Sequence, residues 1–209
     1  MKKFLVAIVA VLFAAPSFAQ ISSGGFSLNE STVYYGLRMG LNVSNLTGDA
    51  TDTGAKPGLN LAGVLGIRVS DSTPIFLESG LYYTQRGAKK NKNTYANLNY
   101  LEIPILLKYG IQATDEIAVL PFIGPTFSYG ISGKSKYGDA DKVDSFSNDL
   151  LDFKRLDAGI KLGCGAEYNK LYLEMGYQFG LSNIADWKIG ADDASVHNGA
   201  FFVNLGVNF

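Results

Sequence analysis

The chain has 209 residues, including 24 glycines, 12 tyrosines and 13 phenylalanines, and this mixture of turn formers and aromatics is typical of a single all-β domain. The formal net charge is −1 and no tract is rich in lysine and arginine, which argues against a nucleic-acid partner. The single cysteine, Cys164, excludes an internal disulfide framework and any CxxC motif.

The start of the chain has the pattern of an export signal. Two lysines precede an apolar run, and Ser17 and Ala19 put small residues at positions −3 and −1 of a cleavage site. The run is shorter than the roughly 20 residues that a spanning helix needs. Because Gln20 and not a cysteine follows, no lipoprotein anchor is expected. The predicted organisation is a signal peptide at 1–19, a short periplasmic segment at 20–32 and a barrel domain at 33–209.

Eight later segments alternate, with period two, between apolar side chains and polar or small ones, as half-buried strands do. In the clearest of them Leu171 and Leu173 alternate with Tyr172 and Glu174. The fifth is the least regular because it contains two prolines. The predicted strands are 33–43, 59–69, 75–85, 101–109, 117–129, 156–168, 171–181 and 201–209.

The lengths of strands and connections favour a membrane barrel. About 11 residues rising ~3.3 Å each at a tilt of roughly 40° cover ~28 Å, close to the apolar band of an outer membrane. Asn169, in the shortest connection, suits the positive φ of a type I′ turn. Short turns are predicted at 71–74, 111–116 and 169–170, and long polar loops at 44–58, 87–97, 131–154 and 183–197.

These features predict an all-β, eight-stranded antiparallel up-and-down transmembrane β-barrel in the bacterial outer membrane, with short turns and both termini in the periplasm. Odd-numbered side chains from 33 to 209 are expected to face lipid. A soluble lipocalin-like barrel is the rival fold, and it would put its apolar face inside. The aromatics that fit two interfacial girdles are Tyr35, Tyr109, Tyr168 and Phe209 at one end, and Tyr83, Phe127, Tyr129 and Phe201 at the other.

Two stretches and the last residue resemble a known family. They are Y-L-E-I-P-I-L-L-K-Y at 100–109, P-F-I-G-P at 121–125, and Phe209. On these residues the chain resembles the small outer-membrane β-barrel family of Bacteroidetes, the porin-like or PorT-like outer membrane protein beta-barrel domain. The resemblance implies location and fold but no single activity, since some members serve secretion. It also implies that Phe209 is a C-terminal assembly signal, read by the barrel-assembly machinery during insertion.

The polar face, projected inward, predicts a charge network in the lumen. Five cations against five anions suit a narrow interior where unpaired charge is expensive, so a solid plug is expected. A narrow pore is the alternative, assisted by inward glycines such as Gly36, Gly40, Gly66, Gly159, Gly163 and Gly176, although these also make room for Arg and Tyr side chains. The predicted network is Arg38, Arg68, Glu78, Arg86, Glu102, Lys108, Asp157, Lys161, Glu167 and Glu174.

Catalytic and metal-binding sites are not expected, and neither is a cofactor. The single histidine, His197, lies near Ser195, Asp192 and Asp193, but no hydrolase motif surrounds them. A second acidic group lacks the glycine turn and the distal glutamate of a calcium loop. That group is Asp139, Asp141 and Asp144.

The surface loops are the predicted place of interaction. Lys89, Lys90 and Lys92 are candidates to contact lipopolysaccharide phosphates, and the loops are candidates to meet an extracellular partner. Cys164 is predicted to face lipid, and Trp187 to lie at headgroup level or in a partner contact. The predicted function is that of a monomeric, non-catalytic outer-membrane barrel with an envelope structural or surface-loop interaction role. The alternatives are a narrow porin-like channel for small solutes and a component of a protein secretion apparatus.

Overall fold

The computed structural model describes residues 33–49, 53–70, 72–147, 152–189 and 192–209. The predicted signal peptide at 1–19 and the segment at 20–32 lie outside the described residues. Within the described part of the chain, no helix is long and apolar enough to cross a membrane.

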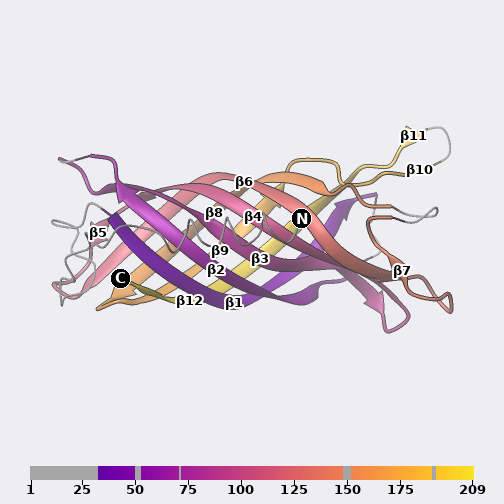
Figure 1. The fold of residues 1–209 in the computed structure, drawn as a ribbon, viewed down its shortest axis with the longest axis horizontal. Coiled ribbons are helices and arrows are strands. Elements are labelled where there is room, and N and C mark those ends of the chain that lie inside the picture. Colours follow the sequence, from indigo (N-terminus) through magenta and orange to yellow (C-terminus); the bar gives the residue numbers. More distant parts are fainter. Residues whose placement is uncertain (1–32, 50–52, 71, 148–151, 190–191) are drawn as a thin grey trace, which may run out of the picture.

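Eight long strands and four two-residue strands make up the described structure (Figure 1). The long strands are β1 (Val33–Gly48), β2 (Lys56–Arg68), β3 (Ile75–Asn91), β4 (Thr94–Tyr109), β6 (Ile117–Lys136), β8 (Leu156–Tyr168), β9 (Leu171–Gly180) and β12 (Val196–Asn208). The short ones are β5 (Ile111–Gln112), β7 (Val143–Asp144), β10 (Lys188–Ile189) and β11 (Asp192–Asp193).

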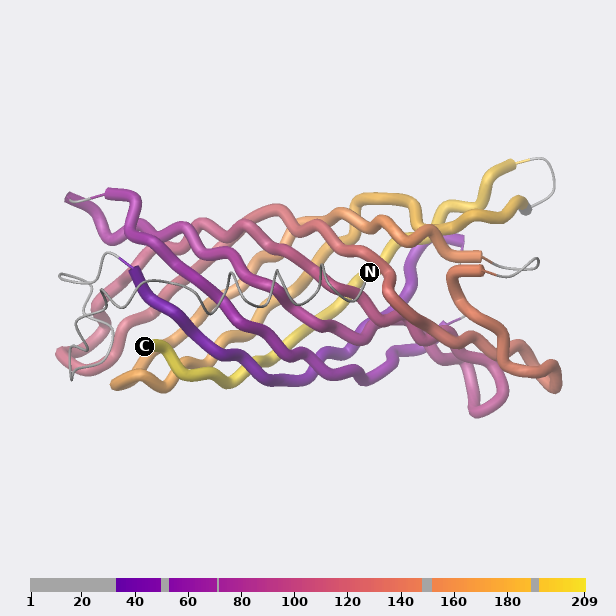
Figure 2. The backbone as a smooth tube through the Cα atoms, viewed as in Figure 1, coloured from indigo at the N-terminus to yellow at the C-terminus, as the bar shows by residue number. Residues whose placement is uncertain are grey.

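The eight long strands form one closed antiparallel barrel. Each pairs with the next long strand along the chain, and β1 pairs with β12 from Gly36↔Asn208 to Gly48↔Val196, which closes the sheet. The strands cross the barrel obliquely, as Figure 2 shows. This confirms the predicted eight-stranded up-and-down barrel.

The two ends of the barrel differ. At one, here called the turn end, the connections are short, and the turn between β8 and β9 has Asn169 at φ 53° and Lys170 at φ 86°. Two consecutive positive φ values define a type I′ hairpin, so the prediction for Asn169 is confirmed. β5 and the end of β12 lie at this end, whereas β7, β10 and β11 lie at the opposite one, here called the loop end (Figure 1).

The predicted long loops are partly wrong, because strands continue into them at the loop end. β3 and β4 remain paired from Gly87↔Asn97 to Asn91↔Thr94, so 87–97 is a hairpin and not a loop. β1 runs to Gly48 and β6 to Lys136. Polar side chains do not end a strand, since the backbone groups still pair with a neighbour.

The barrel has an apolar exterior and a polar interior. On β1, Leu37 and Leu41 are 61% and 62% exposed, whereas Arg38 and Asn42 between them are 3% and 2% exposed. Cys164 is exposed on the exterior of β8, as the alternation within its own strand predicted. The expectation that odd-numbered side chains face outward is wrong for β8, where Asp157 points inward and Leu156 outward, and for β6 beyond Gly130, where Lys134 points outward and Ser135 inward. The connection from β6 to β8 changes the parity, since Tyr129 pairs with Leu156.

Candidate functional site

The interior holds two clusters of ion pairs at different heights. The cluster nearer the turn end centres on Glu78 of β3, here called the Glu78 cluster. Its carboxylate forms an ion pair with Lys108 Nζ at 2.8 Å, accepts a hydrogen bond from Tyr34 Oη at 2.7 Å, and lies 3.5 Å from Arg38 Nη2. Lys108 also donates to Tyr172 Oη at 2.8 Å, and the Arg38 guanidinium stacks 4.0 Å from the Tyr172 ring centroid.

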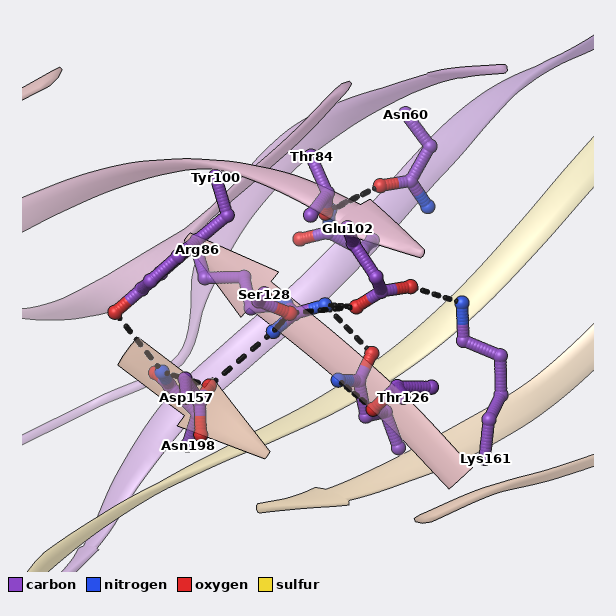
Figure 3. Close-up of polar contacts among 12 residues, drawn as sticks. Asn60, Thr84, Arg86, Tyr100, Glu102, Thr126, Ser128, Asp157, Lys161 and Asn198 are labelled. Carbon is purple, nitrogen blue, oxygen red and sulfur yellow. Dashed lines mark hydrogen bonds and ion pairs between the residues drawn. The ribbon is translucent and has the colours of Figure 1, made fainter. Parts of the chain in front are cut away.

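The second cluster centres on Glu102 of β4, which lies six residues from Lys108 toward the loop end, and is here called the Glu102 cluster. Its polar contacts are drawn in Figure 3. Arg86 Nη2 donates to Glu102 Oε2, and Lys161 Nζ lies 2.5 Å from Glu102 Oε1. Arg86 also reaches Asp157 Oδ2 at 3.4 Å and donates to Gln178 Oε1 at 2.7 Å. One arginine therefore joins β3, β4, β8 and β9 across the lumen.

Uncharged polar side chains fill the space between the two clusters. Asn60 Nδ2 donates to Asn204 Oδ1 at 3.2 Å, and Asn204 Nδ2 donates to Glu174 Oε1 at 2.8 Å. Asn42 and Thr84 both donate to Asn60 Oδ1, at 2.8 and 2.7 Å. The predicted network contained only charged residues and so omitted these uncharged ones, although they occupy inward-facing positions in the same period-two alternation.

The lumen charges balance locally. The Glu78 cluster contains Arg38 and Lys108 against Glu78 and Glu174, which lies 3.9 Å from Lys108 Nζ. The Glu102 cluster contains two cations and two anions as well. Because a buried charge is costly unless paired, this neutrality is what permits so many ionised groups in one lumen.

Two of the ten predicted network residues form described hydrogen bonds outside these two clusters. Glu167 accepts a hydrogen bond from Asn208 Nδ2 at 2.6 Å, and Arg68 donates through Nε to the Ser70 carbonyl at 2.8 Å near the turn end. The other eight meet in the two clusters. Sequence parity placed these residues on one face but did not pair them.

Inward glycines accommodate large side chains. A Cβ at Gly66 would overlap the ring of Tyr34, and a Cβ at Gly176 would meet the ring of Phe202 at 2.8 Å. Phe202 itself stacks on Phe122 with ring centroids 6.4 Å apart. The glycines thus make space for aromatic rings that fill the lumen, which argues for a packed interior.

An apolar cluster covers the lumen at the loop end and is here called the loop-end cap. Ile184 and Val196 are fully buried in it, and Trp187 packs edge-on against Phe153 with centroids 5.2 Å apart. The sequence predicted only polar loops here, although the apolar residues within 131–154 and 183–197 were a signal. The buried members are Leu46, Ala88, Ala96, Leu98, Tyr100, Phe146, Phe153, Ile184, Ala185, Ala194 and Val196.

Ser195 and His197 lie within hydrogen-bond distance at the loop end, with Ser195 Oγ 3.2 Å from His197 Nε2. The other imidazole nitrogen faces the Ser182 carbonyl at 2.9 Å, and among the described residues no carboxylate is hydrogen-bonded to the ring. Asp192 is exposed in β11, and the exposed Asp193 pairs with Lys188 at 3.8 Å. An exposed serine–histidine pair held by a backbone carbonyl lacks the acid and the sheltered pocket of a hydrolase triad.

The remaining candidates lie in exposed positions at the loop end. Within the described ranges, no group of three or more acidic, histidine or cysteine side chains is arranged to hold a metal ion. Asp139 accepts a hydrogen bond from Asn93, and Asp144 accepts one from the Phe146 amide, while Asp141 is exposed. Lys89, Lys90 and Lys92 are also exposed, but Lys90 lines a cavity of about 140 Å³ above the loop-end cap.

Comparisons with known proteins agree with this architecture. The model of the family described as outer membrane protein beta-barrel domain matches residues 18–186. No curated protein matches the sequence significantly. The crystal structure of Neisserial surface protein A (NspA) is similar with a TM-score of 0.50 and 18% identity, over 86% of this chain and 98% of that one, and at this identity it supports the fold alone.

Two further solved structures have lower TM-scores. A major outer membrane protein from Thermus thermophilus has a TM-score of 0.49 at 11% identity, over 86% of this chain and all of that one. Ail, the attachment invasion locus protein of Yersinia pestis, has a TM-score of 0.45 at 13% identity, with the same coverage.

Proposed function

Because the chain belongs to the outer membrane protein beta-barrel domain family, and is therefore an outer-membrane β-barrel protein, we propose that it is a closed, non-catalytic barrel. Its role is to support the envelope and to present its loop end to an extracellular partner. The observation on which this depends is the filled, electrically neutral lumen, covered at one end by the loop-end cap. A barrel packed in this way is a rigid scaffold.

The exterior supports a lipid environment and an orientation. Large apolar side chains are exposed on every long strand of the barrel, and Phe209 is 66% exposed at its turn end. Such a continuous apolar surface is stable in lipid and not in water. Short turns are periplasmic in barrels of this kind, so we place the turn end and both termini in the periplasm. With every edge paired by closure, a monomer suffices.

The rival functions have less support. A narrow channel requires a continuous polar path, whereas the Arg86 and Lys108 side chains each cross the lumen and are 1% exposed. For catalysis by Ser195 and His197, the described part of the chain offers no acid hydrogen-bonded to the imidazole. A role in a secretion apparatus rests only on the resemblance of residues 100–109 and 121–125 to PorT-like members, and it stays the second alternative.

The membrane location is tested by fractionating the cell envelope and comparing electrophoretic mobility with and without boiling. We expect the protein in the outer-membrane fraction, with a mobility that shifts on heating. Recovery of a freely water-soluble protein without detergent would overturn the proposal.

The closed lumen is tested by reconstitution in planar bilayers, where we expect no discrete conductance from the natural protein. The double variant Arg86→Ala/Glu102→Ala is the matched positive control, because it removes the ion pair through which β3 and β4 contact β8 and β9 across the lumen. Discrete single-channel steps from the natural protein would contradict closure and favour the channel.

A further inference from the structure

The outer wall of β3, β4 and β6 changes character in successive cross-strand rows toward the loop end. The first row is apolar and aromatic, the second is uncharged and polar, and the next two contain lysine. The rows are Tyr83↔Leu101↔Tyr129, Gln85↔Asn99↔Ser132, Gly87↔Asn97↔Lys134, and Lys89↔Tyr95↔Lys136. A β-bulge at Asn99/Tyr100 keeps Lys134 and Lys136 on the outer wall, since it reverses the parity of β6 beyond Gly130.

The height of the lysines above the apolar band follows from the register. On β4, Asn97 lies four residues beyond Leu101, which is ~13 Å along the strand and ~10 Å along the barrel axis at a tilt of roughly 40°. Tyr95 lies six residues beyond Leu101, which is ~20 Å along the strand and ~15 Å along the axis. The headgroup layer extends about 5–7 Å beyond the hydrocarbon. Lysine side chains reach back by about 6 Å when they snorkel, so their ammonium groups lie at and just above this layer.

Along the described part of this wall, cations outnumber acids. Among the described residues, no ion pair joins Lys89, Lys134 or Lys136 to a carboxylate. The nearest acid by register is Asp144, opposite Lys134, and its Oδ1 accepts a hydrogen bond from the Phe146 amide at 2.8 Å. Three cations against one acid leave this face positive. At the same end of β1 and β2, the outward positions hold the uncharged Asn45, Thr47 and Pro57.

We propose that Lys89, Lys134 and Lys136, with the hydroxyl and ring of Tyr95, bind the sugar-linked phosphates of an outer-leaflet glycolipid of the lipopolysaccharide class. Phosphates carried on sugars project farther from the acyl chains than the phosphate of a phospholipid, which matches the height of this row. Of the three lysines predicted from the sequence, only Lys89 belongs to this face. The assignment rests on the proposed outer-membrane location and orientation.

The test is titration of the purified protein, in neutral-detergent micelles, with lipopolysaccharide. The variant Lys89→Gln/Lys134→Gln/Lys136→Gln removes these three charges, and Lys92→Gln/Lys154→Gln/Lys188→Gln removes the same charge from exposed positions elsewhere at the loop end. Each lysine near an anionic surface contributes about a 5-fold change in affinity, so we expect on the order of 100-fold weaker binding by the first variant and little change in the second. Dephosphorylated lipopolysaccharide should bind the natural protein as weakly as intact lipopolysaccharide binds the first variant.

Three outcomes would overturn the proposal: unchanged binding by the first variant, equal weakening in both variants, or equally tight binding of phosphatidylglycerol. Inorganic phosphate is a further arm, and competition by it at low millimolar concentration would assign the site to a free anion instead. Heat-modifiable mobility is measured for every variant. If the natural protein lacks heat-modifiable mobility, the proposed barrel function fails. If the first variant is heat-modifiable and binds lipopolysaccharide as tightly as the natural protein, only this inference fails.

Discussion

Arg86 on β3 and Glu102 on β4 face each other inside the barrel, and the same carboxylate also receives the Lys161 ammonium. Both Arg86 and Glu102 are 1% exposed. One carboxylate therefore pairs with two buried cations, and at this burial solvent water does not compensate for its removal. Glu102 is therefore a position of the lumen at which a substitution is expected to be costly.

Replacing Glu102 with Leu is expected to destabilise the barrel by about 3–5 kcal/mol, because it leaves Arg86 and Lys161 buried with one fewer anion. Equilibrium urea unfolding in lipid vesicles measures this difference. Asp139→Asn, at an exposed position, is the control and should change stability by less than about 0.5 kcal/mol. A loss below about 1 kcal/mol for the leucine variant would mean that the network does not hold the lumen together.

Two glycines of β2 differ in their surroundings and give a matched pair. A Cβ at Gly66 would overlap the Tyr34 ring, whereas a Cβ at Gly63 meets nothing within 4 Å. We expect Gly66→Ala to cost about 1–3 kcal/mol through overpacking, and Gly63→Ala to be neutral or slightly stabilising. The midpoints of denaturant unfolding give the comparison. Equal effects of the two changes would show that Tyr34 moves aside freely.

The loop-end cap should unfold locally without the barrel. Ile184→Ala, at a fully buried position, is expected to remove about 2–4 kcal/mol from the stability of the cap. Protease sensitivity within 182–197 should rise, while heat-modifiable mobility stays unchanged. Leu181→Ala, where the side chain is 61% exposed, is the control and should leave protease sensitivity as it is. Loss of the mobility shift in the Ile184 variant would show that cap and barrel fold as one unit.

The β8–β9 turn offers a local test of backbone conformation. Lys170 has a φ of 86°, which glycine adopts at no steric cost, so Lys170→Gly should stabilise the protein or leave it unchanged. Asn169→Val places a β-branched residue at φ 53° and should cost about 1–2 kcal/mol. Refolding yield into vesicles and urea midpoints report both effects. If valine is tolerated at 169, the turn is not of type I′ in the vesicle-inserted protein.

The sequence determined the local properties of this protein. Strict alternation between Leu171 and Gly180 defined a strand with one apolar face, and similar alternation gave eight strands and hence the barrel. Asn169 marked its turn because positive φ is a property of single residues. These features depend on residues that are neighbours in the sequence, so they could be predicted before the pairing of the strands was known.

Only the tertiary structure decided which side chains meet. Glu78 binds Lys108 and Arg86 reaches Asp157 because strand tilt and stagger in the closed barrel set which residues of different strands share a height. The same cause aligned Lys89 with Lys136 through Tyr95, and brought Phe153 and Trp187 together in the cap. Such contacts depend on the register between strands that are distant in the sequence. Period-two alternation does not fix this register, because a shift of one strand by two residues keeps the same side chains on the same face.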